Sequence, residues 1–128
     1  MIKFVIGFGS LSSGGNVASE LRHVELAFVP RNTCNSNYNG GISDVMMCAA
    51  DPGQDSCQGD SGGPLYDQAN NALVGVVSWG FGCADPNYPG VYAQVSSRVR
   101  IVDGDVTFNC NHTISCLSHY YLFYAFHL

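Results

Sequence analysis

Short apolar runs alternate with clusters of Gly, Ser, Asn and Pro up to about residue 95. This pattern is typical of an antiparallel all-β fold, because strands of about four to eight residues need turn residues between them. The apolar runs predict six strands, at residues 3–8, 21–29, 45–49, 64–66, 73–79 and 90–95. After Val95 the pattern changes, and the chain ends in an aromatic-rich stretch around Tyr120–Tyr124.

Length, charge and cysteine content narrow the class of protein. A chain of 128 residues has room for one domain. Charged residues make up 12% of it, and the net charge of −5 comes without a basic run, which excludes a nucleic-acid-binding face. No apolar run approaches the ~20 residues of a membrane helix, and residues 1–6 are too short for a signal-peptide core. Six cysteines in so small a chain indicate an oxidising compartment.

Residues 55–64, DSCQGDSGGP, carry the chemistry that the rest of the chain must support. A serine such as Ser61 becomes a nucleophile when a base takes its proton and nearby donors stabilise the oxyanion. The flanking glycines allow the amides of Gly59 and Ser61 to converge on one point. Pro64 prevents a helix from following, so the segment is predicted as a loop that leads into a strand. An α/β-hydrolase elbow, which needs a helix there, does not fit.

This ten-residue run resembles the nucleophile loop of the trypsin and chymotrypsin family of serine endopeptidases. Further segments agree with that family, and the resemblance extends from Val5 to Val95. They are Gly7-Phe8-Gly9, with Phe in place of the family's Trp, Ser78-Trp79-Gly80 followed by Gly82-Cys83, and Pro89-Gly90-Val91-Tyr92. The resemblance implies a six-stranded antiparallel Greek-key barrel, the second barrel of the family's two-barrel fold.

Three motifs of the family do not occur in these 128 residues. They are the Ala-Ala-His-Cys that contains the general base, the Asp that orients it, and the Ile-Val-Gly-Gly amino terminus. All three precede the matched segment in the family, so we expect a C-terminal half, with residues 1–98 as the barrel. Residues 99–128 are expected to form a divergent tail of unknown structure, either a true extension or an artefact of gene prediction.

The resemblance also implies roles for individual residues. Ser61 is the nucleophile, and the amides of Gly59 and Ser61 form the oxyanion hole. Asp55 corresponds to the carboxylate at the base of a pocket that selects Arg or Lys, since a buried carboxylate binds a guanidinium or ammonium group strongly. The remaining substrate-binding residues are Ser56, Gln58, Ser78, Trp79, Gly80, Gly90 and Tyr92. Two disulfides are implied, Cys34–Cys48 and Cys57–Cys83.

Asp60 resembles the residue that pairs with the family's new N-terminal amine after activation. Without that amine a buried Asp60 carboxylate would cost several kcal/mol. We therefore expect its side chain to turn outward and the Gly59 amide to leave its productive position, as in a zymogen.

The histidines and the remaining cysteines have no assigned role. His23 lies within a predicted strand, and His112, His119 and His127 lie in the tail, so all four are interpreted as surface or packing residues. The cysteines lack paired CxxC spacing, so neither a metal site nor a cofactor is predicted. Cys110 and Cys116 are unassigned, and Asn111-His112-Thr113 is a glycosylation sequon that matters only in an exported chain.

Two functional hypotheses remain. In the first, the chain is part of a secreted trypsin-like serine endopeptidase that cleaves protein or peptide substrates after Arg or Lys and binds protein protease inhibitors. It would be nearly inert alone, because removal of a triad member leaves only residual catalysis. In the second, it is a non-catalytic pseudoprotease or binding module that keeps the Arg/Lys pocket. A lone barrel is also expected to expose the apolar face that normally meets its partner, and so to aggregate or dimerise.

Overall fold

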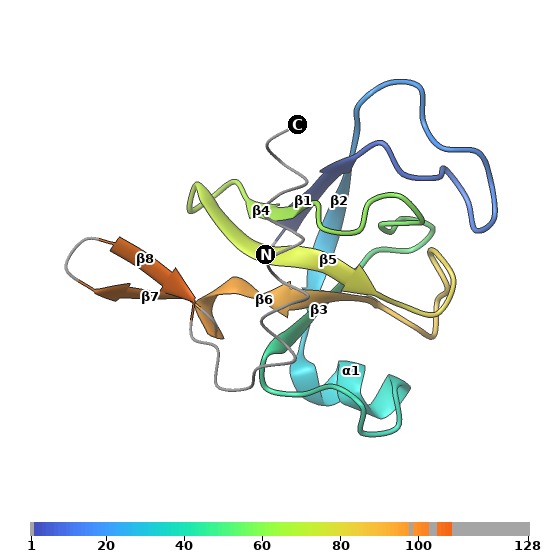
Figure 1. Cartoon of the computed structure of the whole chain (residues 1–128). Coiled ribbons are helices and arrows are strands. Elements are labelled where there is room, and N and C mark those ends of the chain that lie inside the picture. Colours follow the sequence, from blue (N-terminus) through green and yellow to red (C-terminus); the bar gives the residue numbers. More distant parts are fainter. Residues whose placement is uncertain (1, 98, 103–104, 109–128) are drawn as a thin grey trace. The chain divides into compact units, whose positions relative to one another are not determined.

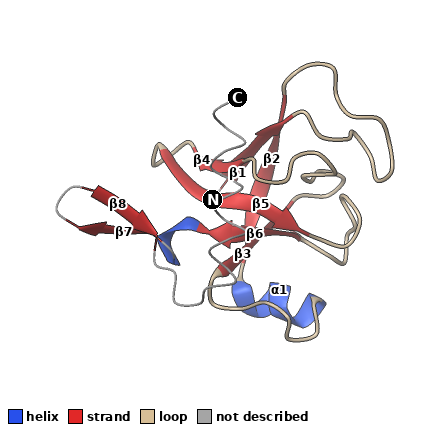
Figure 2. Cartoon of the chain, in the orientation of Figure 1, coloured by secondary structure: helices blue, strands red, loops and turns tan. Residues whose placement is uncertain are grey.

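The computed structural model describes residues 2–97, 99–102 and 105–108 of the chain. Its contacts divide the chain into two units, Met1–Val95 and Ser96–Leu128. The first unit contains six strands, and Figures 1 and 2 show how they curve around one another. They are β1 (Ile2–Gly7), β2 (Arg22–Val29), β3 (Met46–Ala50), β4 (Pro64–Asp67), β5 (Ala72–Trp79) and β6 (Gly90–Gln94).

These strands close into an antiparallel barrel in the order β1-β2-β3-β6-β5-β4. The predicted six-stranded all-β barrel is therefore confirmed, and each predicted strand agrees with the observed one to within one residue at either end. Closure depends on a short ladder between β1 and β4, in which Phe4 pairs with Tyr66 and Val5 with Leu65. That ladder joins β1 to the strand that directly follows the nucleophile loop.

Alternate residues of the strands point inward and form a core inside the barrel, one of two hydrophobic clusters in the described residues. It contains side chains from all six strands: Val5, Leu26, Met47, Ala49, Leu65, Val77 and Tyr92. Leu26, Leu65 and Tyr92 are fully buried. Complete burial of a side chain such as Leu contributes about 1.5–3 kcal/mol, so this core provides the scaffold on which the loops are held.

The helix α1 (Arg31–Asn37) was not predicted from the sequence. It follows Pro30, whose ψ of 139° is not helical, and its sequence RNTCNSN has no apolar stripe. Its one buried residue is Cys34, which forms a disulfide with Cys48 of β3. The disulfide and the burial of Cys34 hold α1 against the barrel.

A buried ion pair joins β1 to the end of β4. Lys3 is 5% exposed and Asp67 is 3% exposed, and the Lys3 ammonium donates to the Asp67 carboxylate. Asp67 also accepts hydrogen bonds from the side-chain amide of Asn70, at 2.8 Å, and from the backbone amide of Ala69, at 3.1 Å. The bond from Lys3 is the main reason that the pKa of Asp67 is lowered to about 2.

The second unit contains a short antiparallel hairpin of β7 (Val99–Val102) and β8 (Asp105–Phe108). The one-turn 3-10 helix η1 (Val95–Ser97) precedes it. Cys110, Cys116, the sequon and the three tail histidines, to which sequence reasoning assigned no role in the fold, lie outside the described residues. Within the described ranges, no helix has the length and apolar character needed to span a bilayer.

Candidate active site

Ser61 lies on an exposed turn that hydrogen bonds fix to the barrel. The Gly62 amide donates to the Val77 carbonyl and the Val77 amide donates to the Gly63 carbonyl, each at 2.9 Å. Gly59 and Gly62 have φ values of 98° and 83°, a backbone region that side chains disfavour. The backbone that directly follows Ser61 is thus bound to strand β5, and Ser61 itself is exposed.

Close backbone contacts explain why the turn requires glycine at position 63. A Cβ atom on Gly63 would lie 2.8 Å from the Asp60 carbonyl oxygen and 3.2 Å from the Ile6 carbonyl oxygen. The Gly63 amide also donates to that Asp60 carbonyl at 2.8 Å, and the Asp60 amide donates to the Cys57 carbonyl at 3.0 Å. Two consecutive tight turns therefore build the loop, and no larger residue fits at the second.

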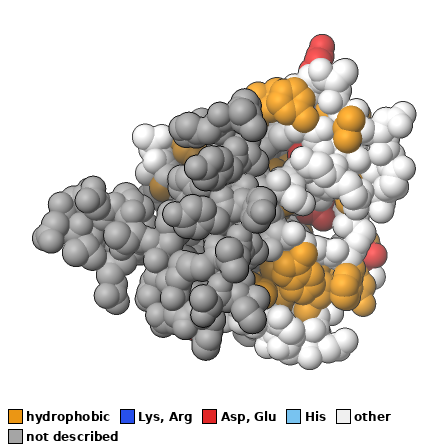
Figure 3. Space-filling model, viewed as in Figure 1, with side chains coloured by type: hydrophobic (Ala, Val, Ile, Leu, Met, Phe, Trp, Pro, Cys, Tyr) orange, Lys and Arg blue, Asp and Glu red, His pale blue; other side chains and the backbone are white. Residues whose placement is uncertain are grey.

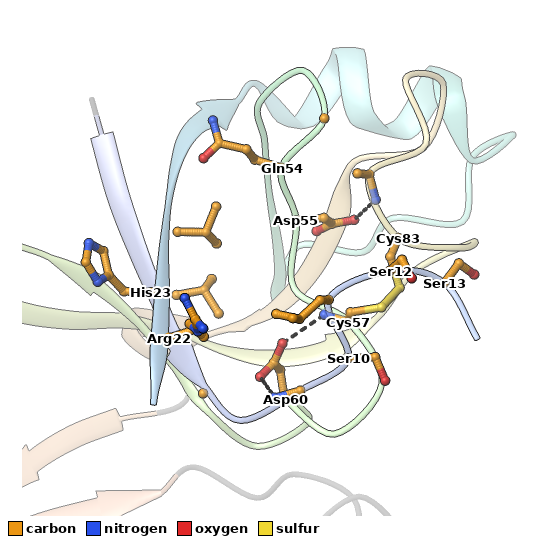
Figure 4. Close-up of a pocket in the computed structure, with 17 residues that line it drawn as sticks. Ser10, Ser12, Ser13, Arg22, His23, Gln54, Asp55, Cys57, Asp60 and Cys83 are labelled. Carbon is orange, nitrogen blue, oxygen red and sulfur yellow. Dashed lines mark hydrogen bonds between the residues drawn. A yellow bond between two sulfur atoms is a disulfide. The ribbon is translucent and has the colours of Figure 1, made fainter. Parts of the chain in front are cut away.

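Asp60 does not turn outward, so the sequence-based expectation for its side chain was wrong. Its carboxylate accepts hydrogen bonds from the Gly9 amide at 2.8 Å and from the Cys57 amide at 3.0 Å (Figure 4). A Cβ atom on Gly7 or Gly9 would lie within 2.6 Å of a carboxylate oxygen. Hydrogen bonds from two backbone amides offset the cost of burying part of the Asp60 carboxylate. The two glycines of the Gly7-Phe8-Gly9 segment leave space for its oxygen atoms.

Asp60 lines a cavity of about 420 Å³. Arg22 of β2 lies across from the loop that carries Asp55 and Asp60 (Figure 4), and its neighbour His23 also lines the cavity. The cavity is distinct from the predicted substrate pocket, because of the predicted pocket residues only Asp55 lines it. It is a water-accessible space next to the Asp60 carboxylate, which sequence reasoning did not reveal.

Asp55 is held by two backbone donors in a half-buried position. Its Oδ1 accepts from the Ser56 amide at 2.8 Å, and its Oδ2 accepts from the Ala84 amide at 3.0 Å. A Cβ atom on Gly90 would lie 2.6 Å from Oδ1, so only glycine leaves the space beside this oxygen open. Burial raises the pKa of Asp55 above its ordinary value, despite the hydrogen bonds from Ala84 and Ser56 that lower it.

Tyr92 closes the base of this site. Its hydroxyl lies 3.1 Å from the Ser56 hydroxyl, and a Cβ atom on Gly90 would lie 3.0 Å from the Tyr92 oxygen. The ring is completely buried, and burial raises the pKa of the phenol well above its usual range. The structure thus places Asp55, Ser56, Gly90 and Tyr92 together.

The predicted pocket strands β5 and β6 lie side by side, with Trp79 paired with Val91. Ser78 and Trp79 are exposed at the end of β5, and a Cβ atom on Gly80 would lie 3.8 Å from the Gly90 Cα. The two segments that contain the predicted substrate-binding residues Ser78 to Gly80 and Gly90 to Tyr92 are therefore adjacent. Where the surface in Figure 3 is not grey, apolar side chains form separate patches.

An aromatic cluster at this edge was not predicted. It consists of Tyr38, Trp79, Phe81 and Tyr88, with Tyr38 at its centre. The Tyr38 ring lies 4.9 Å from Trp79, 5.3 Å from Phe81 and 5.4 Å from Tyr88 between centroids. Its hydroxyl donates to the Pro89 carbonyl at 2.7 Å, and burial raises the pKa of this phenol. Only Trp79 of the cluster had been assigned a role from the sequence.

Gln58 connects the nucleophile loop to the loop that follows β1. Its carbonyl accepts from the Ser10 amide at 2.8 Å, and its side-chain oxygen accepts from the Gly14 amide at 3.3 Å. The neighbouring Cys57 forms a disulfide with Cys83, and Cys34 with Cys48, so both implied pairings are present in the structure. Sequence spacing alone would not reveal the contact with residues 10–14.

His23 is the one histidine among the described residues. It is exposed on β2, and its ring centroid lies 6.0 Å from that of Phe4. It lines the cavity beside Asp60, whereas Ser61 does not line that cavity. No three or more His, Cys, Asp or Glu side chains in the described part of the chain form a group that could hold a metal ion.

Comparison with known proteins connects this geometry to a family. The family model described as Trypsin matches residues 3–102. The chain belongs to the trypsin family. Among relatives, it is 53% identical over 96 residues to Trypsin alpha-4 from Lucilia cuprina, a match that covers 73% of this chain and 37% of that protein. It is 49% identical over 100 residues to Trypsin-1 from Astacus astacus, covering 74% of this chain and 42% of that protein.

The chain spans only part of the length of the trypsins that it matches. Against Trypsin alpha-3 from Lucilia cuprina, the chain is 53% identical over 96 residues and spans 57% of that protein's length. The trypsin family is a family of serine protease hydrolases, and the family resemblance recognised at residues 55–64 is confirmed. The barrel with the serine turn and the Asp55 site is the portion of a trypsin-like fold that these residues supply.

Proposed function

We propose that this chain supplies the nucleophile and the substrate pocket of a secreted trypsin-type endopeptidase that cleaves after Arg or Lys. Ser61 attacks the scissile carbonyl, and the amides of Gly59 and Ser61 stabilise the oxyanion. In this proposal the general base and its orienting Asp are supplied by residues other than those of the described barrel, so we expect the chain alone to be nearly inert. Disulfides Cys34–Cys48 and Cys57–Cys83 support an oxidising, extracellular location.

The position of Asp55 is the observation that carries the proposal of Arg/Lys preference. Its carboxylate is half-buried, and Gly90 leaves space beside Oδ1. Burial raises the pKa of Asp55 even though two backbone amides donate hydrogen bonds to the carboxylate. An ionised carboxylate whose charge is only partly balanced by hydrogen bonds is stabilised most by a bound guanidinium or ammonium group. A neutral side chain would leave that charge buried and unpaired, which is costly.

The placement of Asp60 supports an activation role within the same proposal. Its carboxylate is already turned toward the cavity and toward Gly9, and two amides hold it there. An amine that entered the cavity would meet an oriented counter-charge rather than one that must first turn inward. Activation of this chain would then not require the Asp60 side chain to change its direction.

A second candidate function is a pseudoprotease or binding module that retains the Arg/Lys pocket. The observation that favours it is that Asp55, Ser56, Gly90 and Tyr92 are assembled, whereas the described residues bring no histidine to Ser61. Such a module binds cationic peptides, or the basic residue of a protein inhibitor, without cleaving them. Binding and turnover therefore have to be measured separately.

Binding is tested with a small arylamidine, a flat cation of about the size of an arginine head group. Titration calorimetry of the chain and of Asp55→Asn is expected to show at least a tenfold loss of affinity in the variant. Glu25→Gln, which removes an exposed carboxylate from β2, is the matched control and is expected to bind as the parent does. Because burial raises the pKa of Asp55 above its ordinary value, affinity should begin to fall at a higher pH than for an ordinary Asp. Equal affinities for parent and Asp55→Asn would refute the cation pocket.

Turnover is tested with an arginyl ester, comparing the chain with its Ser61→Ala variant. Hydrolysis that exceeds the variant's shows serine catalysis and rules out the binding module. Equal rates with intact amidine binding are expected of both functions in the isolated chain, and the choice between them then rests on the coding sequence. Upstream coding sequence provides a further test of the endopeptidase: in-frame Ile-Val-Gly-Gly and Ala-Ala-His-Cys segments support it, and a stop codon before Met1 counts against it.

A further inference from the structure

The loops of the barrel contain no basic residue. The segments that connect its strands and helix, residues 8–21, 38–45, 51–63, 68–71 and 80–89, contain neither Lys nor Arg. Exposed loop tips are where proteolytic nicking concentrates, because an endopeptidase needs a segment that can leave its surroundings and extend. An enzyme that cuts after Arg or Lys therefore finds no target bond in any of these loops.

Two of the three basic residues of the barrel unit are held by their side chains. Lys3 is 5% exposed and engaged by Asp67, and its strand β1 pairs with β2 on one side and β4 on the other. Arg31 begins α1, and its guanidinium donates to the Ser43 carbonyl and, at 2.9 Å, to the Gln94 side chain. Neither side chain can enter a peptidase pocket while these contacts persist.

Arg22 is the exception. Its side chain is 61% exposed, and its ion pair with Glu20 is loose, at 3.7 Å. It is the first residue of β2 and pairs with Gly7 of β1, whereas the pairing of β2 with β3 covers only Ala27 to Val29. The backbone at Arg22 is thus held from one side and directly follows a loop, so it opens more easily than the strand centre.

We infer that the barrel resists endopeptidases of Arg/Lys specificity and that Arg22–His23 is its single early cleavage site. If the chain is part of a trypsin-type peptidase, as proposed, this resistance protects it from cleavage by enzymes of the same specificity. The resistance of the barrel does not depend on the proposed function. Cleavage adds water across the bond between the Arg22 carbonyl carbon and the His23 nitrogen, leaving a carboxylate on Arg22 and an amine on His23. Both disulfides lie after this bond, so the released segment, residues 1–22, carries β1 without a covalent tether to the barrel.

Limited digestion of the full chain tests the inference, with a trace of an external endopeptidase specific for Arg and Lys. The chain carries Ser61→Ala, so none of the cleavage can come from its own serine. Mass spectrometry is expected to show Arg22–His23 as the first bond cut within residues 1–95. Arg22→Gln should slow the loss of the intact barrel at least tenfold.

A second variant tests the role of the loops. Ser13 is exposed in the turn that the Gly15 amide closes on the Ser12 carbonyl at 2.9 Å, so Ser13→Arg adds a basic residue at a loop tip. It should be cut after residue 13 at least tenfold faster than the parent is cut after Arg22, and Ser13→Gln is the control for substitution at this position. The urea-unfolded chain should be cut after Lys3, Arg22 and Arg31 alike.

Early cleavage after Lys3 or Arg31 in the folded chain would overturn the inference, as would a Ser13→Arg variant that survives as long as Ser13→Gln. These outcomes are independent of the amidine and ester tests. A chain that binds no amidine and hydrolyses no ester would still show the digestion pattern if the loops protect it. A chain that does both but is cut after Arg31 would refute only the present inference.

Discussion

Replacing Gly90 by Ala would drive a methyl group into the Asp55 site. The added Cβ would lie 2.6 Å from Asp55 Oδ1, about 0.8 Å short of the 3.4 Å at which ordinary contact begins, and 3.0 Å from the Tyr92 oxygen. The carboxylate cannot retreat freely, because the amides of Ser56 and Ala84 hold it at 2.8 and 3.0 Å. Loss of one such charged hydrogen bond costs about 1.5–3 kcal/mol, and overpacking of a filled site typically costs about 1–3 kcal/mol. We expect a loss of about 2–3 kcal/mol in the free energy of unfolding.

Gly80→Ala is the matched control, since its Cβ would meet the Tyr38 oxygen at 3.7 Å and the Gly90 Cα at 3.8 Å, both ordinary contacts. It should stay within about 1 kcal/mol of the parent, because Ala also lowers the entropy of the unfolded chain. Urea unfolding followed by circular dichroism separates the two, with a midpoint shift of about 1 M or more for Gly90→Ala alone. In an Asp55→Ala background the cost of Gly90→Ala should shrink by at least about 1 kcal/mol. Unchanged stability of Gly90→Ala, or no coupling to Asp55, would refute the reasoning.

Three further predictions concern the scaffold. Replacing Cys34 and Cys48 by Ala opens a loop with a sequence separation of 14, for which chain entropy gives about 3 kcal/mol of lost stability; a calorimetric loss below about 1 kcal/mol would count against this. The lowered pKa of Asp67, about 2, means that its contribution to stability is complete above about pH 4 and disappears as the pH falls toward 2. The Tm of Lys3→Met should therefore lie well below the parent's at pH 6 and approach it near pH 2, and a constant difference would contradict the assignment. Tyr38→Phe keeps the ring contacts but removes the bond to a backbone carbonyl, so urea unfolding should show a loss of about 1–2 kcal/mol, and no loss would mean that water replaces that bond.

The strands could be predicted from the sequence because each carries its own signal. Strand β1, for example, is the apolar run IKFVIG followed by Gly and Ser residues, although burial of Lys3 rather than Ile2 could not be predicted from that run. Helix α1 has no such signal, because its Asn, Ser and Thr residues favour turns and caps as readily as a helix. Helix α1 is held in place by the buried Cys34, which forms a disulfide with Cys48 of a strand later in the chain.

Sequence reasoning could assign site residues where a family motif contains them, and it missed contacts that depend on a backbone atom far away in the chain. The side-chain direction of Asp60 depends on the Gly9 amide, 51 positions earlier in the chain. The Lys3 partner lies 64 positions away, so the sequence placed Lys3 in a strand without indicating its ion pair. The aromatic cluster joins Tyr38 to rings beyond residue 78 for the same reason. Only folding brings these donors and rings together.

Trp79 is the only tryptophan in the chain, and it lies at the edge of the proposed pocket with 37% of its surface exposed. Its indole emission therefore reports on this one location. The nearby Tyr38 ring, at 4.9 Å, makes that emission sensitive to small displacements of the pocket edge. Any cation, peptide or inhibitor that occupies the pocket can be followed optically in the unlabelled protein, in real time and at low concentration.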